Sequence, residues 1–375
     1  MNSILNRSKT LWQLGIIAFF VVISTGYLAA QHDDHNTHGS SNEDWEEEVM
    51  QQEFQAGEMI IHHITDAYEW HIMTIGHTHI SIPLPIMLYD EGEFHFFMSS
   101  VFHHSKEHNG YFISHHDMNS GKLVRKNAAG EEVRPTLDFS FTKNVLAIFL
   151  SGLLMIWIFT SIAKSYKRRA GMAPKGLQSW LEPLILFIRD DIAKASIGEK
   201  KYKKYLPFLL TIFFFIFFNN LLGLVPFFPG GANVTGNIGV TGVLALFTFI
   251  ITTVSGNKNY WVHIINTPGV PWWLKIPVPL MPIVELMGVF TKPFVLMVRL
   301  FANISAGHII ILGFISLIFI FGEISAGAGY GVAVVSVSFS IFMFILELLV
   351  AFIQAYVFTL LSALYFGMAV EEAHH

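Results

Sequence analysis

Long apolar runs dominate the second half of the chain, whereas short alternating segments occupy part of the first half. About twenty consecutive apolar residues are enough to cross a bilayer as a helix. Five runs approach or exceed this length, at about 143–163, 206–226, 238–255, 283–321 and 331–367. The pattern predicts an all-α polytopic membrane domain over residues 141–375, with five transmembrane segments.

The last two apolar runs are too long to stand upright in a membrane. Each covers nearly forty residues, so a continuous helix would be about 55 Å long against a hydrocarbon core of about 30 Å. The residues that upright helices would expose to water, in 309–321 and 332–344, are mostly apolar. We therefore predict two long, steeply tilted antiparallel helices, joined by a turn near Gly322 to Gly331.

Residues 1–30 have the pattern of a secretory signal peptide. Arg7 and Lys9 precede an apolar run from Leu14 to Ile23, and small residues follow that run. The apolar stretch continues to Ala30 and approaches spanning length, so an uncleaved signal anchor stays open as an alternative. Both alternatives predict that the following segment is exported.

Residues 31–140 predict an exported domain that is at first disordered and then β-rich. The first part is acidic and rich in histidine, and it lacks the apolar periodicity of a folded element. Strand-like alternation follows at 68–75, 79–82, 94–97 and 137–141. Turn signals separate these segments, at Asp90-Glu91-Gly92, Asn109-Gly110 and Asn119-Ser120-Gly121. The pattern indicates a small β-rich domain.

The distribution of lysine and arginine predicts the orientation of the membrane domain. Eleven of these residues lie between 164 and 204, whereas 227–237 and 322–330 contain none. Because cytoplasmic loops carry the excess of basic residues, the basic segment and the C-terminus are predicted to be cytoplasmic and residues 31–140 to lie outside the cell membrane. Apolar residues at helical spacing over 177–192 also predict a helix on the inner membrane surface.

Composition supports the membrane assignment and excludes several functions. The chain is 53% hydrophobic and 14% charged, with a mean hydropathy of +0.50. It has no cysteine, which excludes thiolate catalysis and Cys-based metal sites. Its net charge of −5 provides no basic excess for nucleic acid. The spacing from Gly171 to Gly176 lacks the Lys and Ser/Thr of a nucleotide-binding loop, so we expect no nucleotide hydrolysis and no cofactor on this chain.

A few ionisable residues lie inside the long apolar runs, where they are candidates for function. Arg299 has apolar neighbours on both sides, and a permanent charge there costs several kcal/mol unless it meets water or a partner. Glu285, Lys292 and Arg299 are seven residues apart and Asn303 follows four later, so they share one helix face. The alternative is an arginine near a helix end that extends its charge to the membrane surface.

The last two helices are predicted to bring two further pairs together. His308 is nine positions after Arg299 and points to another side of the helix, whereas Glu347 and Gln354 share a face. In an antiparallel hairpin His308 and Glu347 lie at comparable depth, and Arg299 and Gln354 meet deeper. Histidine beside a carboxylate can relay protons, whereas arginine stays charged. The pattern indicates two offset half-channels beside a fixed positive charge; a buried structural ion pair is the alternative for His308 and Glu347.

The motifs around these residues resemble subunit a of the F-type ATP synthases. They are Thr291-Lys292-Pro293, Arg299-Leu300-Phe301-Ala302-Asn303-Ile304-Ser305-Ala306-Gly307-His308, Gln354-Ala355-Tyr356-Val357-Phe358, Met368-Ala369-Val370-Glu371-Glu372 and Asn219-Asn220-Leu221-Leu222-Gly223-Leu224-Val225-Pro226. Together they cover most of residues 143–375. The resemblance implies a non-catalytic stator subunit of the proton channel, which couples proton flow to rotation and ATP synthesis.

The resemblance also implies partners and a role for each candidate residue. The implied partners are a c-subunit ring, a b-subunit stalk, the remaining ATP synthase subunits and the lipid bilayer. Arg299 would face the ring with Gln354 beside it; Asn303, His308 and Glu347 would line the outer path, and Glu285 with Lys292 the inner one. This chain departs from the common bacterial pattern in two ways. Many bacterial members have Glu at the position of His308 and His at the position of Glu347. Many also have only a short exposed N-terminus.

Histidines across residues 32–116 raise the alternative of a metal-ion transporter. Imidazole binds zinc and titrates near neutral pH, but these histidines lack a fixed companion carboxylate or cysteine pattern. We therefore predict no metal site. A transporter would bring several ligands together at mid-depth, often between repeated halves, whereas this chain has one intramembrane histidine and no internal repeat. A purely structural anchor would leave the polar face of Arg299 unexplained.

Overall fold

The computed structural model describes residues 56–371 with short gaps. The gaps are 76–77, 105–106, 115–118, 120, 128–129, 170, 226–227, 229 and 266–279. The predicted signal peptide or anchor at 1–30 and the acidic segment that follows it lie outside the described residues. So does part of the histidine-rich stretch.

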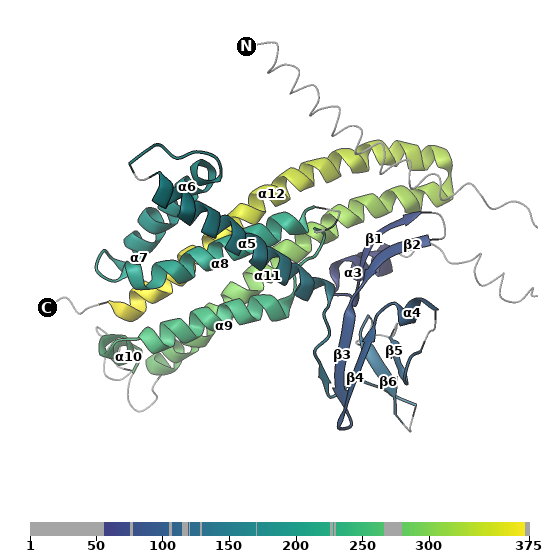
Figure 1. The fold of residues 1–375 in the computed structure, drawn as a ribbon, viewed down its shortest axis with the longest axis horizontal. Helices are drawn as coiled ribbons and strands as arrows, with labels where there is room; N and C mark the ends of the chain where they lie inside the picture. Colours follow the sequence, from purple (N-terminus) through teal and green to yellow (C-terminus); the bar gives the residue numbers. More distant parts are fainter. Residues whose placement is uncertain are drawn as a thin grey trace, which may run out of the picture.

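Among the described residues, five helices are long and apolar enough to cross a membrane, which confirms the predicted polytopic all-α architecture. They are α5 (Lys143–Arg168), α8 (Tyr202–Gly223), α9 (Ile238–Ser255), α11 (Leu280–Ile324) and α12 (Ala326–Val370). The last two have 45 residues each, or about 68 Å of helix against a hydrocarbon core of about 30 Å. They pack side by side as one long hairpin (Figure 1).

The turn of this hairpin is much tighter than the predicted segment from Gly322 to Gly331. Helix α11 continues to Ile324 and α12 begins at Ala326, so Ser325 alone separates them. The Ser325 hydroxyl accepts a hydrogen bond from the backbone N–H of Ala328 at 3.1 Å, as an N-cap does. Gly329 allows the two helices to approach closely, because a Cβ on Gly329 would lie 2.9 Å from the Cα of Gly322.

The predicted surface helix over 177–192 is present but contains a change of geometry. Helix α6 (Leu177–Phe187) continues into the π-helical segment η2 (Ile188–Lys194) and then into α7 (Ala195–Ile197). Ile188 and Ile192 are buried, whereas Trp180 is 83% exposed. The apolar side of this segment therefore packs on the bundle. A further short helix, α10 (Lys258–Ile265), precedes α11.

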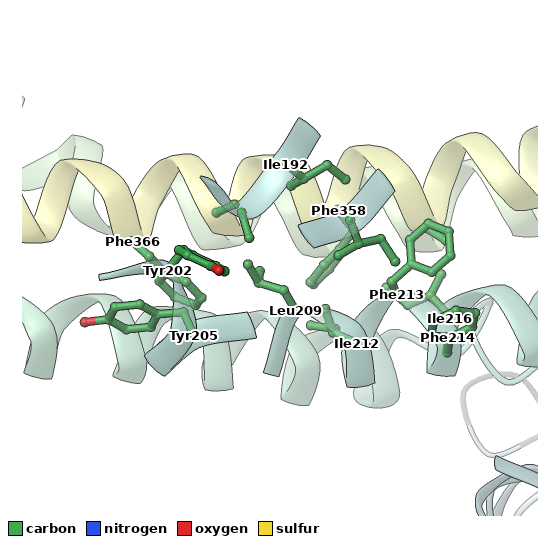
Figure 2. Close-up of a cluster of buried hydrophobic side chains, with 14 of the residues drawn as sticks. Ile192, Tyr202, Tyr205, Leu209, Ile212, Phe213, Phe214, Ile216, Phe358 and Phe366 are labelled. Atoms are coloured by element: carbon green, nitrogen blue, oxygen red, sulfur yellow. The ribbon is translucent and has the colours of Figure 1, made fainter. Parts of the chain in front are cut away.

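Helix α8 lies at the centre of the hydrophobic core. Its side chains are apolar almost all the way round, which suits a helix surrounded by others. Leu209, Phe213 and Phe214 are fully buried, and they belong to one cluster with Phe358 of α12 and Ile192 of η2 (Figure 2). The core therefore holds α12 and the surface segment against the same helix.

The N-terminal part is β-rich, as predicted, and forms three small antiparallel sheets. Their strand orders are β1 (Glu69–Ile75) with β2 (Thr78–Pro83); β4 (Glu93–Met98), β3 (Pro85–Asp90) and β8 (Leu137–Asp138); and β5 (Tyr111–Ile113), β6 (Leu123–Lys126) and β7 (Glu132–Val133). Two short helices, α3 (Ala56–Ile64) and α4 (Val101–His104), accompany them. We call residues 66–141 the β-rich region.

The alternating segments at 68–75, 79–82 and 94–97 correspond to β1, β2 and β4, whereas 137–141 is a strand only at its start. The signal at Asp90-Glu91-Gly92 is the β3–β4 turn, where Glu91 and Gly92 have φ of 51° and 91°. Positive φ at both central residues is typical of tight hairpins. Strands β3, β5, β6 and β7 were not predicted, since three of them have only two to four residues and β3 lacks clear alternation.

Specific contacts join the β-rich region to the membrane helices. The carboxylate of Asp66 accepts hydrogen bonds from the Thr142 hydroxyl at 2.7 Å and from the Asn144 N–H at 3.0 Å, at the first turn of α5. Trp70 of β1 is 2% exposed and packs against Ala147 of α5 and Val234 of the loop after α8. The region is therefore part of the same packed structure as the helices.

Candidate functional site

The candidate residues of α11 and α12 lie between two ends of the helical bundle. We call the end next to the β-rich region the β-side and the end next to α10 and the C-terminus the C-terminal side (Figure 1). Lys292 is seven residues before Arg299 along α11 and His308 nine after it. At 1.5 Å per residue, these positions lie about 10 Å and 14 Å from Arg299 in opposite directions.

On the β-side the structure brings His308 and Glu347 together. His308 Nδ1 lies 2.6 Å from Glu347 Oε1, and the two side chains are 18% and 4% exposed. Nδ1 also lies 3.1 Å from the carbonyl oxygen of Ile304. A buried carboxylate needs such a partner, because an unpaired charge in the interior is strongly destabilising. The pair places an imidazole, which can bind and release a proton, beside a carboxylate that can accept one.

Gly307 makes room for this pair. A Cβ on Gly307 would lie 2.8 Å from Glu347 Oε1, closer than side chains tolerate. A Cβ on Gly223, at the end of α8, would lie 3.2 Å from the carbonyl oxygen of Ala232, and its distance of 4.0 Å from His308 Nε2 would be an ordinary contact. Glycine inside a helix lowers its stability, so its presence at position 307 indicates a close approach. From the sequence alone, Gly307 and Gly223 are only positions within a motif.

The loop after α8 closes over the pair instead of lying in water. Asn233 and Thr235 are 4% and 1% exposed. The Thr235 hydroxyl donates to Asn220 Oδ1, and the Asn220 amide donates to the carbonyl oxygen of Ala351 on α12 at 3.2 Å. Ser305 of α11 donates to the carbonyl oxygen of Gly236 at 3.3 Å. The loop is thus packed against both long helices.

Several buried polar atoms on α8, on α12 and in the loop after α8 lack a hydrogen-bond partner among the described residues. They are Asn219 Oδ1, both amide atoms of Asn233, Ser340 Oγ and, apart from the His308 contact, the carboxylate oxygens of Glu347. Buried polar groups are nearly always bonded to protein or water. These atoms are therefore available to bind water. Asn219, Asn233 and Thr235 were not predicted as site residues, although polar side chains in an apolar span are a usable signal.

Arg299 and Asn303 lie on an uncovered face of α11. Both are exposed, whereas Leu296, Leu300 and Ile304 are 1–3% exposed and pack into the bundle. No hydrogen bond or ion pair of Arg299 is found within the described part of the chain, so the predicted contact with Gln354 is not observed. Gln354 is instead buried at 6% exposure. A guanidinium at membrane depth needs an acidic partner, which here would come from another chain.

On the C-terminal side, Lys292 lines a cavity between four helices. Its walls are Thr248, Phe249, Thr252, Thr253, Tyr260, Val289, Lys292, Pro293, Tyr365 and Met368. The Lys292 ammonium lies 5.7 Å from the centre of the Tyr365 ring, a cation–π contact. Burial, together with the charge of Glu285, raises the pKa of Tyr260 on α10. Lys292, Glu285 and the hydroxyls therefore form a second polar region.

The two polar regions approach Arg299 from opposite ends and are built from different elements. Titratable groups and hydroxyls occur on both sides of Arg299. The permanent positive charge of Arg299, which lies between the two polar regions, would repel a free cation. Within the described ranges, no three histidine, aspartate or glutamate side chains come together as a metal ion requires. The metal-transport alternative therefore has no candidate ligand set in this part of the chain.

Comparisons with known proteins match both parts of the chain. The family model described as ATP synthase A chain matches residues 145–367, and a model of a domain of unknown function matches residues 59–143. A protein of Chlorobium phaeobacteroides is 43% identical over 285 residues, which are 72% of this chain and 78% of its own. A protein of Chloroherpeton thalassium is 44% identical over 245 residues, which are 64% of this chain and 69% of its own. A protein of Myxococcus xanthus is 45% identical over 245 residues, which are 64% of this chain and 76% of its own. All three are named ATP synthase subunit a.

Proposed function

The chain belongs to the ATP synthase A chain family, and on this basis we propose that it is the stator subunit of the proton channel of an F-type ATP synthase. It carries no catalytic site of its own, and nucleotide chemistry takes place on other subunits. The observation that carries this role is Arg299, which is exposed on an uncovered face of α11 and forms no hydrogen bond or ion pair with the described residues. A ring of c subunits, each with a membrane carboxylate, fits that face.

Orientation follows from the basic residues between α5 and α8. The β-side faces the periplasm and the C-terminal side faces the cytoplasm of a bacterial inner membrane. The cluster around His308 and Glu347 is then the outer half-channel, and the cavity at Lys292 is the inner one. The b-subunit stalk and the remaining subunits hold this chain still while the ring turns.

Protons enter through the outer half-channel by way of His308 and Glu347. A proton delivered to a ring carboxylate neutralises it, so that the site can turn into the lipid without the cost of a bare charge. Asn303, exposed one helical turn from Arg299, lies where this transfer occurs. Gln354, buried on α12, supports the same region from within.

Protons leave through the cavity beside Lys292 and Glu285. As a protonated ring site returns, the positive charge of Arg299 stabilises its ionised form, and the proton passes to the cavity hydroxyls. Arginine keeps its charge throughout, so protons cannot pass directly from one half-channel to the other. The transmembrane potential contributes about 2.3 kcal/mol per charge per 100 mV.

Replacement of Arg299 tests the proposal. In inverted membrane vesicles that contain the assembled complex, we expect Arg299→Ala to abolish ATP-driven acidification and to increase passive proton leak. Arg168→Ala removes one exposed positive charge at the end of α5 and is expected to pump like the wild type. Pumping at the wild-type rate by assembled Arg299→Ala would refute the role given to this residue.

A further inference from the structure

The sheet β4–β3–β8 is apolar on both faces. One face carries Ile86, Leu88 and Phe97, which are buried in a cluster with Tyr111 and Leu123 of the neighbouring sheet. The other face carries Met87, Tyr89, Phe94, Phe96, Met98, Leu137 and Phe139. We call this second set the aromatic face.

The strand register places these residues together. Met87 lies opposite Phe96, and Tyr89 lies opposite both Phe94 and Leu137. Directly paired residues of antiparallel strands point to the same side of a sheet. Phe94 and Phe96 are 61% and 62% exposed, so large rings lie open on the surface.

A sheet with one solvated face normally alternates apolar and polar residues. The aromatic face contains no charged residue, and contiguous exposed apolar surface marks an interaction site. Its composition of phenylalanine, tyrosine, methionine and leucine is that of a surface that contacts either protein or lipid.

The position of the sheet indicates which way this face looks. Strands β3 and β4 run across the direction of α5, α8 and α9, and β5 and β6 lie on their far side from those helices (Figure 1). Because β5 and β6 cover the buried face, the aromatic face is on the side of its sheet that is turned away from β5 and β6.

The aromatic face is also continuous with an exposed apolar side of α5. The N–H of Phe139 donates to the carbonyl oxygen of Met87 at 2.9 Å, and α5 begins four residues later at Lys143. The ring of Phe141 lies 5.6 Å from that of Phe149 on α5. Phe149 is 56% exposed, as are Leu153 and Trp157 at 62% and 61% one and two turns further on. The exposed apolar surface therefore runs from the membrane span onto the sheet.

We propose that the aromatic face rests on the outer leaflet of the bilayer, with its rings at the boundary between headgroups and acyl chains. Tyrosine is enriched at this boundary because its ring is apolar and its hydroxyl is polar, and phenylalanine and leucine are typical of the faces by which interfacial helices enter the membrane surface. The proposal depends on the outward orientation given above, but not on proton transport. It assigns the β-rich region a membrane contact that keeps Trp70, and the loop on which Trp70 packs, in place beside the outer half-channel.

Site-directed spin labelling tests this contact, since the chain contains no cysteine and one introduced thiol is unique. The full chain carrying Phe96→Cys, Leu153→Cys or Val133→Cys is labelled with a nitroxide and reconstituted into vesicles of phosphatidylethanolamine and phosphatidylglycerol. Val133, on β7, is 37% exposed and lies outside the aromatic face, so it is the matched control. Accessibility to dissolved oxygen, which partitions into lipid, is compared with accessibility to a water-soluble nickel complex.

We expect the ratio of oxygen to nickel accessibility at position 96 to be raised toward the value at position 153 and to exceed that at position 133. Equal nickel accessibility at 96 and 133 would place the face in water and overturn the proposal. Protection of position 96 from both reagents would also overturn it, because a second copy of the chain would then cover the face. Neither outcome bears on the role of Arg299, which the pumping assay tests separately.

Discussion

The polar regions on the two sides of Arg299 are constructed differently. On the β-side, His308 and Glu347 are in direct contact, and the carboxylate is 4% exposed beneath a packed loop. On the C-terminal side, Lys292 and Tyr365 are only partly buried and line a cavity with three threonines. One side depends on a single tightly packed pair, whereas the other offers several hydroxyls at similar positions.

This difference sets how much each side tolerates change. In a closely packed site, the loss of one titratable group removes the only proton acceptor and leaves its partner unpaired. In a cavity, water and neighbouring hydroxyls can take over from a lost side chain. We therefore expect substitutions on the β-side to have larger effects than those on the C-terminal side.

Glu347→Gln should have the largest of these effects. Glutamine keeps the shape of the side chain but cannot accept a proton, so proton-driven ATP synthesis should fall about 100-fold or more, the scale seen when a positioned proton-transfer group is lost. ATP synthesis by reconstituted complex measures this. Glu323→Gln, near the turn of the hairpin, is the matched control and is expected to remain near wild type. A Glu347→Gln complex that synthesises ATP normally would remove Glu347 from the proton path.

Gly307→Ala should have the next largest effect. The added methyl group would lie 2.8 Å from Glu347 Oε1, and relief of such overpacking costs about 1–3 kcal/mol. The carboxylate must move away from His308, so pumping should fall even though both titratable groups remain. Gly313→Ala, on the same helix with nothing within 4 Å of the new Cβ, should pump normally. Equal pumping by the two variants would show that the close packing of the pair is not required.

Lys292→Gln should have a smaller effect, which sharpens the comparison. Its removal deletes a cation–π contact worth about 0.5–1 kcal/mol but leaves the threonines and tyrosines of the cavity in place. We expect ATP-driven pumping to fall by about two- to fivefold. Lys258→Gln, at the exposed start of α10, is expected to change nothing. A loss as large as that of Glu347→Gln would mean that the inner side also depends on a single group.

Asp90→Asn should affect the acid stability of the β-rich region without changing proton transport. Burial alone would raise the pKa of Asp90, but hydrogen bonds from Thr136 and Tyr111 and the charge of Arg125 outweigh burial and hold this pKa below its ordinary value. Arg125 Nε lies 2.7 Å from the carboxylate. Because the folded-state pKa is lowered, the stabilisation is present above the unfolded pKa of about 3.9 and is lost as pH falls through the folded value.

Amide hydrogen exchange of β3 and β6 in the full chain measures this stability. Protection in the wild type should decrease as the solution becomes more acidic than about pH 4, whereas Asp90→Asn should be less protected at neutral pH and show a flatter acid profile. The same profile in both proteins would show that Asp90 does not stabilise the region. Pumping by Asp90→Asn should equal that of the wild type, which separates the acid response of the fold from that of the channel.

The contact between His308 and Glu347 shows how far spacing could predict the site. An equal distance from a long turn predicted that they would meet, and they do. The observed turn is Ser325 alone, so His308 is 17 and Glu347 is 22 residues from it. The two helices are therefore staggered by about five residues, or roughly 7.5 Å. Spacing identified the partners, but not the register that brings them together.

The sequence by itself determined the features that depend on local composition. Apolar length specified the five long helices of the described residues, apolar periodicity specified the helix over 177–192, and the isolated charge of Arg299 marked the uncovered face of α11. Each follows from the cost of placing backbone or charged groups in lipid, which acts on every segment separately.

Only the tertiary structure decided which distant segments meet. The burial of Asn233 and Thr235, the need for glycine at position 307, the cavity at Lys292 and the continuity of the aromatic face with α5 all involve contacts between separate elements. The same residues would be unremarkable on an isolated loop, helix or strand. Close packing between elements gives them their roles, because it sets the distances at which polar groups pair and apolar surface stays exposed.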